Sequence, residues 1–403
     1  MALPAIFLFP GFNLVTFLIG FVNFYALYIA ISVSLNLEFG YAGVPNFGKV
    51  LFIAGGASVT GSITGRLAAY ALNINTHGDF ITFNFRIIGQ VNPLLPSVPW
   101  LTLGILLLGV VIGAAIGGLF GYLASYPAIR LREDYLGMLL LGVAQFYQVV
   151  LRTYTPLTGG AQNLSVPDPY YYFVSLGTGY RDLAAGVVMS IFAVLVFVYA
   201  ERVARSPLGR TLKAVRESED AARSLGKDDV AIRRKVLVVS SAIAGIAGAL
   251  FTFYVSSVEY DTWTRFAWTF WPFLIVIIGG VGNNYGVALG AFFFALIYKG
   301  LAQIQPYLQP YLFFDANWLQ DLLFATLLIS ILMIRPEGIL KEKSASTLPK
   351  SKLATIIGSG GEPALEHVGG AGKRESRVAK LKRLILRRET KPRPQSDGDS
   401  PNI

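Results

Sequence analysis

The 403-residue sequence lacks cysteine and has only two histidines, His77 and His367. The missing thiols exclude disulfides, thiolate nucleophiles, cysteine zinc sites and iron–sulfur clusters. Charged residues are also scarce, at 14% of the chain against 54% hydrophobic residues, and the mean hydropathy is +0.54. A water-soluble enzyme is therefore disfavoured, because so much apolar surface needs lipid as its solvent.

Sequence patterns for catalysis are equally scarce. The chain has no Gly-x4-Gly-Lys-Ser/Thr loop, so we do not expect it to hydrolyse a nucleotide by that route. The adjacent Glu133 and Asp134 follow Arg130 and Arg132 at an expected helix start, where carboxylates stabilise exposed amides. We therefore predict that the chain is not an enzyme and that it holds no metal.

Nine apolar segments predict an all-α, polytopic membrane bundle of about nine spans, within a range of eight to ten. Most of them are long enough to cross a hydrocarbon core of ~30 Å at ~1.5 Å per residue. Two short pieces separated by glycines give only ~20 Å each, which predicts broken or re-entrant helices or one kinked span. The segments are residues 12–37, 44–71, 100–124, 135–151, 183–200, 236–258, 269–281, 285–298 and 318–334.

Positive charge gathers in two places. Residues 201–235 hold ten Lys and Arg and residues 341–403 hold fourteen, together 24 of the 34 in the chain. Basic loops stay on the cytoplasmic side, so both segments are predicted to be cytoplasmic and the amino terminus to lie outside. We expect a membrane domain over residues 1–340 and a largely disordered tail over 341–403, with one basic helix over 374–389 suited to anionic lipid or a partner protein.

Small residues recur at helical spacing. Gly109, Gly113, Gly117 and Gly121 stand every fourth residue, and Ser241, Gly245 and Ala249 form a similar row. Such a row lets another helix backbone approach closely, so these rows predict a tightly packed bundle, and packing alone is the expected role of most.

Two glycine blocks interrupt apolar runs, residues 40–48 (GYAGVPNFG) and 279–286 (GGVGNNYG). Backbone groups freed at membrane depth are tolerated only inside protein or beside a wet cavity, so both blocks are candidates for lining a solute path; loops at the membrane surface are the alternative. Lys49 follows the first block, and we expect its ammonium to extend to the cytoplasmic interface unless it has a function in the membrane. The candidate path residues are Gly40, Gly43, Asn46, Gly48, Lys49, Gly279, Gly280, Gly282 and Asn283.

The segment over 201–235 predicts short amphipathic helices that begin near Pro207 and end at Gly226. A basic amphipathic helix can lie on lipid or fit a groove on a partner protein. Six acidic residues are mixed into the segment, which favours a protein partner. The expected apolar side consists of Leu208, Leu212, Val215, Ala222 and Leu225.

The same segment resembles the cytoplasmic loop of permease subunits of branched-chain amino-acid ABC importers, in which Ser-x-x-Gly-Arg leads to Ala-x-Arg-Glu and then Ala-Ala-x-x-x-Gly. The chain has Ser206-Pro-Leu-Gly209-Arg210, Ala214-Val-Arg216-Glu217 and Ala221-Ala222-Arg-Ser-Leu-Gly226. Further blocks resemble the family in the same order, and together they cover roughly residues 30 to 340. These blocks are residues 36–43 (NLEFGYAG), 130–136 (RLREDYL), 157–163 (LTGGAQN), 279–286 and 335–339 (RPEGI).

This resemblance implies a multi-pass permease subunit of an ATP-driven importer of branched-chain or related amino acids in the cell membrane. It further implies a paralogous second permease subunit, two cytoplasmic ABC ATPase subunits that bind ATP and magnesium, and an external solute-binding protein, whereas the chain itself binds no cofactor and no nucleic acid. By the same analogy, coupling to the ATPase falls to Arg210, Arg216, Glu217, Ala221, Ala222 and Gly226, and docking of the binding protein to Thr158, Gly159 and Gly160.

The chain departs from the family in places that leave the solute open. A further amino-terminal span, usual in the family, has little room here. The first block continues as Pro45-Asn46-Phe47-Gly48-Lys49 where the family has Ser-Leu-Gly-His, and Gln145 stands near a usual carboxylate, so Gln145 joins the candidate path residues. An importer of urea, amides or another small solute stays open. A secondary transporter is the rival from another class, but its coupling carboxylates would have to be Glu38 or Asp321 near span ends.

Overall fold

The computed structural model of the chain describes residues 13–75, 78–131, 133–312 and 315–342. The chain divides into two units, Met1–Ser344 and Ala345–Ile403, and all described residues belong to the first. His77 and the helix expected over 374–389 lie outside the described residues.

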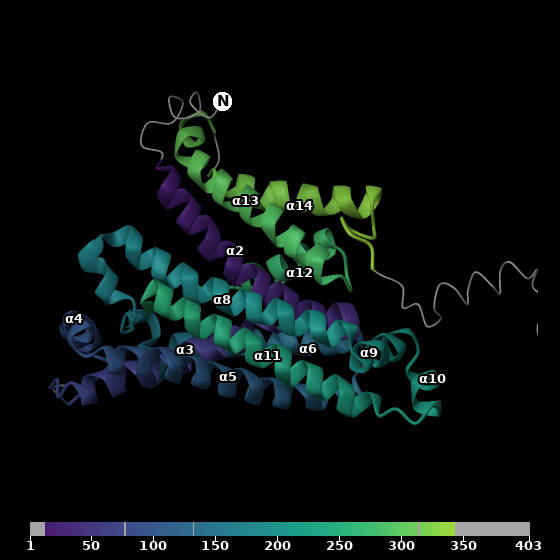
Figure 1. Ribbon diagram of the computed structural model, residues 1–403, viewed down its shortest axis with the longest axis horizontal. Helices are drawn as coiled ribbons and strands as arrows, with labels where there is room; N and C mark the ends of the chain where they lie inside the picture. Colours follow the sequence, from purple (N-terminus) through teal and green to yellow (C-terminus); the bar gives the residue numbers. More distant parts are fainter. Residues whose placement is uncertain (1–12, 76–77, 132, 313–314, 343–403) are drawn as a thin grey trace, which may run out of the picture. The chain divides into compact units, whose positions relative to one another are not determined.

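Seven helices of the described residues are long and apolar enough to cross a membrane, and two shorter apolar helices accompany them (Figure 1). The expected all-α, polytopic architecture is confirmed. The seven are α2 (Leu14–Asn36, continued by the π-helix η1, Leu37–Tyr41), α3 (Lys49–Ala71), α5 (Pro99–Arg130), α6 (Glu133–Thr153), α8 (Thr178–Arg205), α11 (Asp229–Val255) and α13 (Asn284–Leu308). The shorter two are α12 (Trp271–Gly279), preceded by the π-helix η5 (Phe266–Phe270), and α14 (Asn317–Ile334).

Each predicted apolar segment overlaps one of these helices, but several boundaries differ from the prediction. The helix α3 begins at Lys49, so residues 44–48 lie outside any helix. The prediction of a short helical piece over 285–298 is wrong, because α13 has 25 residues and spans about 37 Å at the usual helical rise. The helix continues through Lys299, whose ammonium lies 5.2 Å from the centroid of the Phe24 ring.

The helix α11 packs against both α3 and α5 through small residues. A Cβ atom on Gly113 of α5 would lie only 2.7 Å from the carbonyl oxygen of Gly245 of α11, and one on Gly117 would lie 3.0 Å from the Cα of Gly245. The glycine rows therefore bring two backbones into direct contact, as predicted, and this contact gains dispersion energy where lipid offers no hydrophobic driving force.

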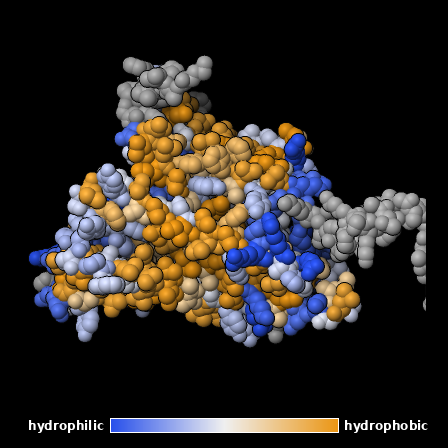
Figure 2. Space-filling view, viewed as in Figure 1, coloured by the Kyte–Doolittle hydropathy of each residue, from blue (hydrophilic) through white to orange (hydrophobic). Residues whose placement is uncertain are grey.

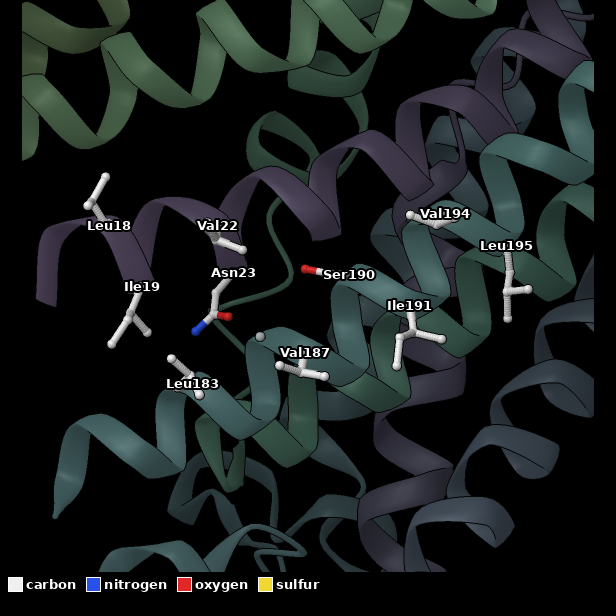
Figure 3. Close-up of a pocket in the computed structure, with 11 residues that line it drawn as sticks. Leu18, Ile19, Val22, Asn23, Leu183, Val187, Ser190, Ile191, Val194 and Leu195 are labelled. Carbon is white, nitrogen blue, oxygen red and sulfur yellow. The ribbon is translucent and has the colours of Figure 1, made fainter. Parts of the chain in front are cut away.

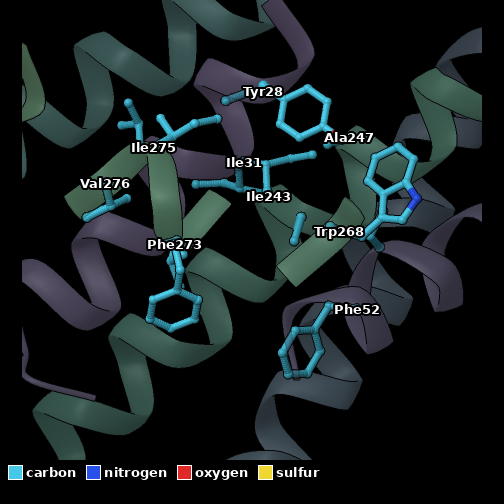
Figure 4. Packing of buried hydrophobic residues seen from close by; sticks show 14 of the residues in the cluster. Tyr28, Ile31, Phe52, Ile243, Ala247, Trp268, Phe273, Ile275 and Val276 are labelled. Carbon is cyan, nitrogen blue, oxygen red and sulfur yellow. The ribbon is translucent and has the colours of Figure 1, made fainter. Parts of the chain in front are cut away.

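The helix α2 lies in the centre of a second group, against α8, α12 and α13. The hydroxyl of Tyr28 donates to the carbonyl of Ala267 at 3.1 Å. Figure 4 shows Tyr28 and Ile31 of α2 in one buried cluster with Ile243 of α11 and Ile275 of α12. The core therefore joins the segments on either side of both glycine blocks.

Short elements lie at the two ends of the bundle (Figure 1). One end, called here the α4 end, holds α4 (Asn84–Leu94) and an antiparallel pair in which Leu164 of β1 lies opposite Val258 of β2. The other, the α9 end, holds α9 (Pro207–Glu217) and α10 (Glu219–Ser224), and Figure 2 shows hydrophilic residues gathered there beside an apolar surface. The other short elements are η2 (Leu95–Ser97), α7 (Thr155–Thr158), η3 (Gly160–Gln162), β1 (Leu164–Ser165), η4 (Tyr171–Leu176), β2 (Ser257–Val258) and η6 (Gln309–Tyr311).

Candidate functional site

The first glycine block breaks the chain between α2 and α3. The last turn of α2 widens into the π-helix η1, and residues 42–48 then reverse the chain outside any helix. Gly43 has φ of +71°, and a Cβ atom there would lie 2.8 Å from Cγ of Arg216. A left-handed backbone with no room for a side chain explains glycine at this position.

The second block separates α12 from α13. Gly280 and Gly282 have φ of +117° and +76°, so the chain leaves the helix through two left-handed residues. Asn283 then caps α13, because its side-chain oxygen accepts hydrogen bonds from the amides of Tyr285 at 3.1 Å and Gly286 at 3.3 Å. Both blocks are therefore built as helix breaks.

The segment after α14 completes the second break. The amide of Ile339 donates to the carbonyl of Ile278 at 2.8 Å, and the amide of Leu340 donates to that of Gly279 at 3.0 Å. The carbonyls at the end of α12 have no partner within their own helix, so this segment supplies the missing donors.

The two breaks meet through Asn36 of α2. Its side-chain oxygen accepts from the amide of Gly282 at 2.9 Å, and its side-chain nitrogen donates to Asn284 at 2.9 Å. A Cβ atom on Gly40 would lie 2.7 Å from the amide nitrogen of Gly282. Two sequence blocks some 240 residues apart thus form one continuous structure.

Lys49 is buried rather than extended to an interface. Its side chain is 0% exposed, and its ammonium lies 3.3 Å from Oε1 of Glu38, which is also 0% exposed. The same ammonium donates to the hydroxyl of Ser240 at 2.7 Å, and the other Glu38 oxygen accepts from Asn46 at 2.9 Å. The expected interfacial position of Lys49 is wrong, because residues 42–48 carry the chain back into the protein before α3 begins.

Glu38 is the functional candidate that sequence reasoning missed. It was placed near a span end, whereas the structure places it inside the first break as the partner of Lys49. A signal was available: Glu38 and Lys49 are the only charged residues before Arg66. Two isolated opposite charges that flank a glycine block indicate a buried pair, since burying either charge alone in a membrane costs too much free energy.

The segment over 201–235 forms α9 and α10, each begun by a serine cap. Ser206 accepts from the amide of Gly209 and Ser218 from that of Ala221. Arg223 donates twice to Asp229, at 2.8 Å each, and this carboxylate raises the pKa of the Arg223 guanidinium. The short helices are thereby fixed to the start of α11.

Arg216 of α9 points into the first break. Its guanidinium donates to the carbonyl of Gly40 and to Glu342, the latter at 2.8 Å. Glu342 also pairs with Lys213 at 2.8 Å, and a Cβ atom on Gly282 would lie 2.8 Å from its carboxyl carbon. One carboxylate after α14 therefore connects α9 to both breaks.

The other predicted coupling residues differ in their exposure to solvent. Ala222 is buried against the chain, whereas Arg210, Glu217, Ala221 and Gly226 are exposed. Leu225 was expected on the buried side but is 79% exposed. It lies just after the last residue of α10, Ser224, so it does not continue the buried face of that helix.

The Thr-Gly-Gly element forms a tight turn. Thr158 is buried and donates to the carbonyl of Leu151 at 3.0 Å, and Gly159 and Gly160 have φ of +75° and +59°. All three residues are buried, so they set the shape of the turn, and its exposed surface comes from neighbours such as Gln162.

Two other features lie apart from the breaks. Gln145 bonds within α6, to Gln148 at 3.2 Å. A groove of about 590 Å³ lies between α2 and α8, lined by apolar side chains with Asn23 and Ser190 among them (Figure 3). A polar solute would find few hydrogen-bond partners in this groove.

Comparisons with known proteins match the sequence to a family. The family model described as branched-chain amino acid transport system / permease component matches residues 17–332. The probable branched-chain amino acid transport permease protein LivM of Methanocaldococcus jannaschii is 37% identical over 338 residues, which cover 83% of this chain and 96% of that protein. No solved structure matches the chain.

More distant relatives extend the same group. The high-affinity branched-chain amino acid transport system permease protein LivM of Salmonella typhimurium is 29% identical over 58% of this chain and 56% of that protein. The autoinducer 2 import system permease protein LsrC of Salmonella choleraesuis is 26% identical over 65% of this chain and 69% of that protein. With its apolar helices, the chain is a multi-pass membrane protein of the branched-chain amino acid transport permease family.

Proposed function

We propose that this chain is the permease subunit of an ATP-driven importer of branched-chain or related amino acids. Its two helix breaks form part of the solute path, and separate ATPase subunits that bind ATP and magnesium dock on α9 and α10. The supporting observation is the contact of Arg216 with the carbonyl of Gly40 and with Glu342, because it links the docking segment to both breaks.

This link gives the proposal a mechanism. A rigid-body push on α9 reaches η1 through Arg216 and the segment after α14 through Glu342. Both are joined to the second break, so the breaks move when α9 moves. A rigid-body motion of packed elements at one end of a transporter can in this way open or close a path between its helices.

The same proposal places the other partners. The α9 end faces the cytoplasm, since basic residues gather there. The α4 end then faces outward, with the amino terminus, and receives the solute-binding protein near the turn at Thr158, Gly159 and Gly160. A second, paralogous permease subunit encloses the path from the opposite side.

Reconstitution tests this function. Proteoliposomes that contain the chain with its companion permease and ATPases should accumulate radiolabelled L-leucine only when ATP and the binding protein are present.

Buried Glu38 favours one rival, a proton-coupled secondary transporter, because a titratable carboxylate inside a span can bind a coupling proton. Accumulation by the chain alone under a proton or sodium gradient would establish that rival and refute the proposal.

Docking on α9 and α10 has its own test. Leu225→Asp should lower co-purification of the ATPases at least about tenfold, because an exposed apolar contact becomes a desolvated charge. Gly226→Pro combined with Glu217→Arg should abolish both association and uptake while membrane insertion stays intact. Tyr311→Asp is the matched control, since Tyr311 is 88% exposed but lies outside α9 and α10. Normal ATPase binding by Leu225→Asp would refute this docking surface.

A further inference from the structure

The Glu38–Lys49 pair lies where two π-helical segments meet. Glu38 belongs to η1, and the residue after Lys49 donates its amide to the Thr269 hydroxyl of η5 at 3.1 Å. A π-helical turn carries one more residue than an α-helical turn and is frequent at functional sites. Both π-helices of the described residues thus border one pair of charges.

Stability alone gives no reason for this pair. Burying two charges costs about as much as their attraction returns, and apolar residues of the same size often do as well. The ammonium–carboxylate distance of 3.3 Å is also longer than the ~2.8 Å of a strong charged hydrogen bond. The stability of the fold alone therefore does not explain why the pair is present.

Each charge has a fixed polar neighbour that keeps it in place. Ser240 accepts from Lys49 through both its hydroxyl, at 2.7 Å, and its carbonyl, at 3.3 Å. Asn46 donates to Glu38 at 2.9 Å and accepts from the amide of Gly48 at 3.1 Å. If the ion pair opened, the ammonium and the carboxylate would keep these neighbours and their orientation.

Aromatic side chains that neighbour Lys49 in the sequence pack in the hydrophobic core cluster. Phe47 stacks on Phe273 with ring centroids 4.7 Å apart, and Phe52 is fully buried one turn after Lys49. Figure 4 shows Phe52, Phe273 and Trp268 as members of this buried hydrophobic cluster. An apolar side chain would be accommodated here better than a polar one.

We infer that Glu38 and Lys49 form a binding site for the head group of a zwitterionic amino acid, which enters by exchanging partners with the ion pair. The ammonium of Lys49 binds the substrate carboxylate, and the carboxylate of Glu38 binds the substrate ammonium. Both buried charges stay paired and the site stays neutral throughout. This inference rests on the proposed import of amino acids and assigns the residues that recognise them.

The exchange sets a requirement for the ligand. A solute with only a carboxylate would leave Glu38 unpaired, and one with only an ammonium would leave Lys49 unpaired. A neutral amide such as urea could form an ion pair with neither Glu38 nor Lys49, so both charges would lose their partner. The site therefore selects molecules that carry both charges close together, with an apolar remainder.

A double variant tests the site in the assembled transporter. Glu38→Gln with Lys49→Met removes both charges and nearly preserves shape, so the fold should persist. We expect L-leucine uptake to fall at least about tenfold, since two charged contacts with substrate are lost, while ATPase association and the unfolding temperature stay near wild type. The control is Asp168→Asn with Arg181→Met, which removes another ion pair, 2.6 Å long and largely buried, and should keep uptake.

The outcomes separate this site from the proposed function. If the wild-type complex imports leucine and the double variant imports it equally well, the pair is structural and the inference fails alone. If the wild-type complex imports no leucine, the proposed function itself fails.

Direct binding gives a second test that needs no variant. The purified chain in nanodiscs should unfold at a higher temperature with millimolar L-leucine. Leucinamide, which lacks the carboxylate, and 4-methylpentanoate, which lacks the ammonium, should give at most about a tenth of the apparent affinity. Equal stabilisation by all three compounds, or none by leucine, would overturn the inference.

Discussion

Glycines serve different purposes in two regions of this chain. Along α5 and α11 they lie within regular helices, and a Cβ atom on Gly113 would lie 2.7 Å from the carbonyl oxygen of Gly245. At the breaks, Gly43, Gly280 and Gly282 have positive φ and end helices. The first region uses the missing side chain, and the second uses the backbone freedom.

This difference separates what is rigid from what can move. Backbone contact between α5 and α11 leaves no space for rearrangement, because close-packed atoms resist displacement. The breaks are instead held by side chains such as Asn36 and Glu342, whose hydrogen bonds can be exchanged one at a time. We therefore expect substitutions in the glycine rows to damage folding and those at the breaks to damage transport.

Gly245→Leu should have the largest effect. Overpacking a backbone contact costs about 3 kcal/mol or more, so the folded fraction should fall sharply in a detergent unfolding titration, and uptake should fall with it. Gly104→Leu on α5 is the matched control, because no atom lies within 4 Å of its Cβ position. Near-wild-type stability of Gly245→Leu would contradict the rigid role of this row.

Gly282→Leu should abolish transport with a smaller cost in stability. A side chain at φ of +76° costs about 1–2 kcal/mol, so the protein should still be expressed and inserted. Its side chain would also collide with Glu342, so uptake should fall at least about tenfold. Gly300→Leu in α13 has open space and should change neither quantity; unchanged uptake by Gly282→Leu would remove the break from the solute path.

Glu342→Gln should have a smaller effect. The change keeps the size of the side chain but removes the charge that pairs with Lys213 and Arg216, so stability should fall by about 0.5–1 kcal/mol. ATP-driven uptake should fall severalfold if this carboxylate links α9 to the breaks. Glu337→Gln, whose pair with Lys341 is exposed, should leave uptake unchanged, and equal uptake by both variants would show that the link is dispensable.

The apolar segments and the short helices α9 and α10 could be predicted because they depend on local composition. Pro207 begins α9, and Leu212 and Val215 are buried as their spacing indicates. The length of α13 was not predicted, because the apolar run breaks off at Lys299, whose ammonium lies over the Phe24 ring of α2 in the folded chain. The burial of Lys49 was missed for the same reason, because its partners Glu38 and Ser240 come from other elements.

The sequence by itself determined that this chain is a lipid-embedded helical bundle with two glycine breaks and a basic segment over residues 201–235, since hydropathy, glycine and charge act over neighbouring residues. Only the tertiary structure decided that the two breaks adjoin through Asn36, that Arg216 reaches the first of them, and that Glu38 and Lys49 form a pair. Such contacts depend on how elements distant in sequence pack, and in a low-dielectric interior each buried charge or amide requires a partner that local sequence does not specify.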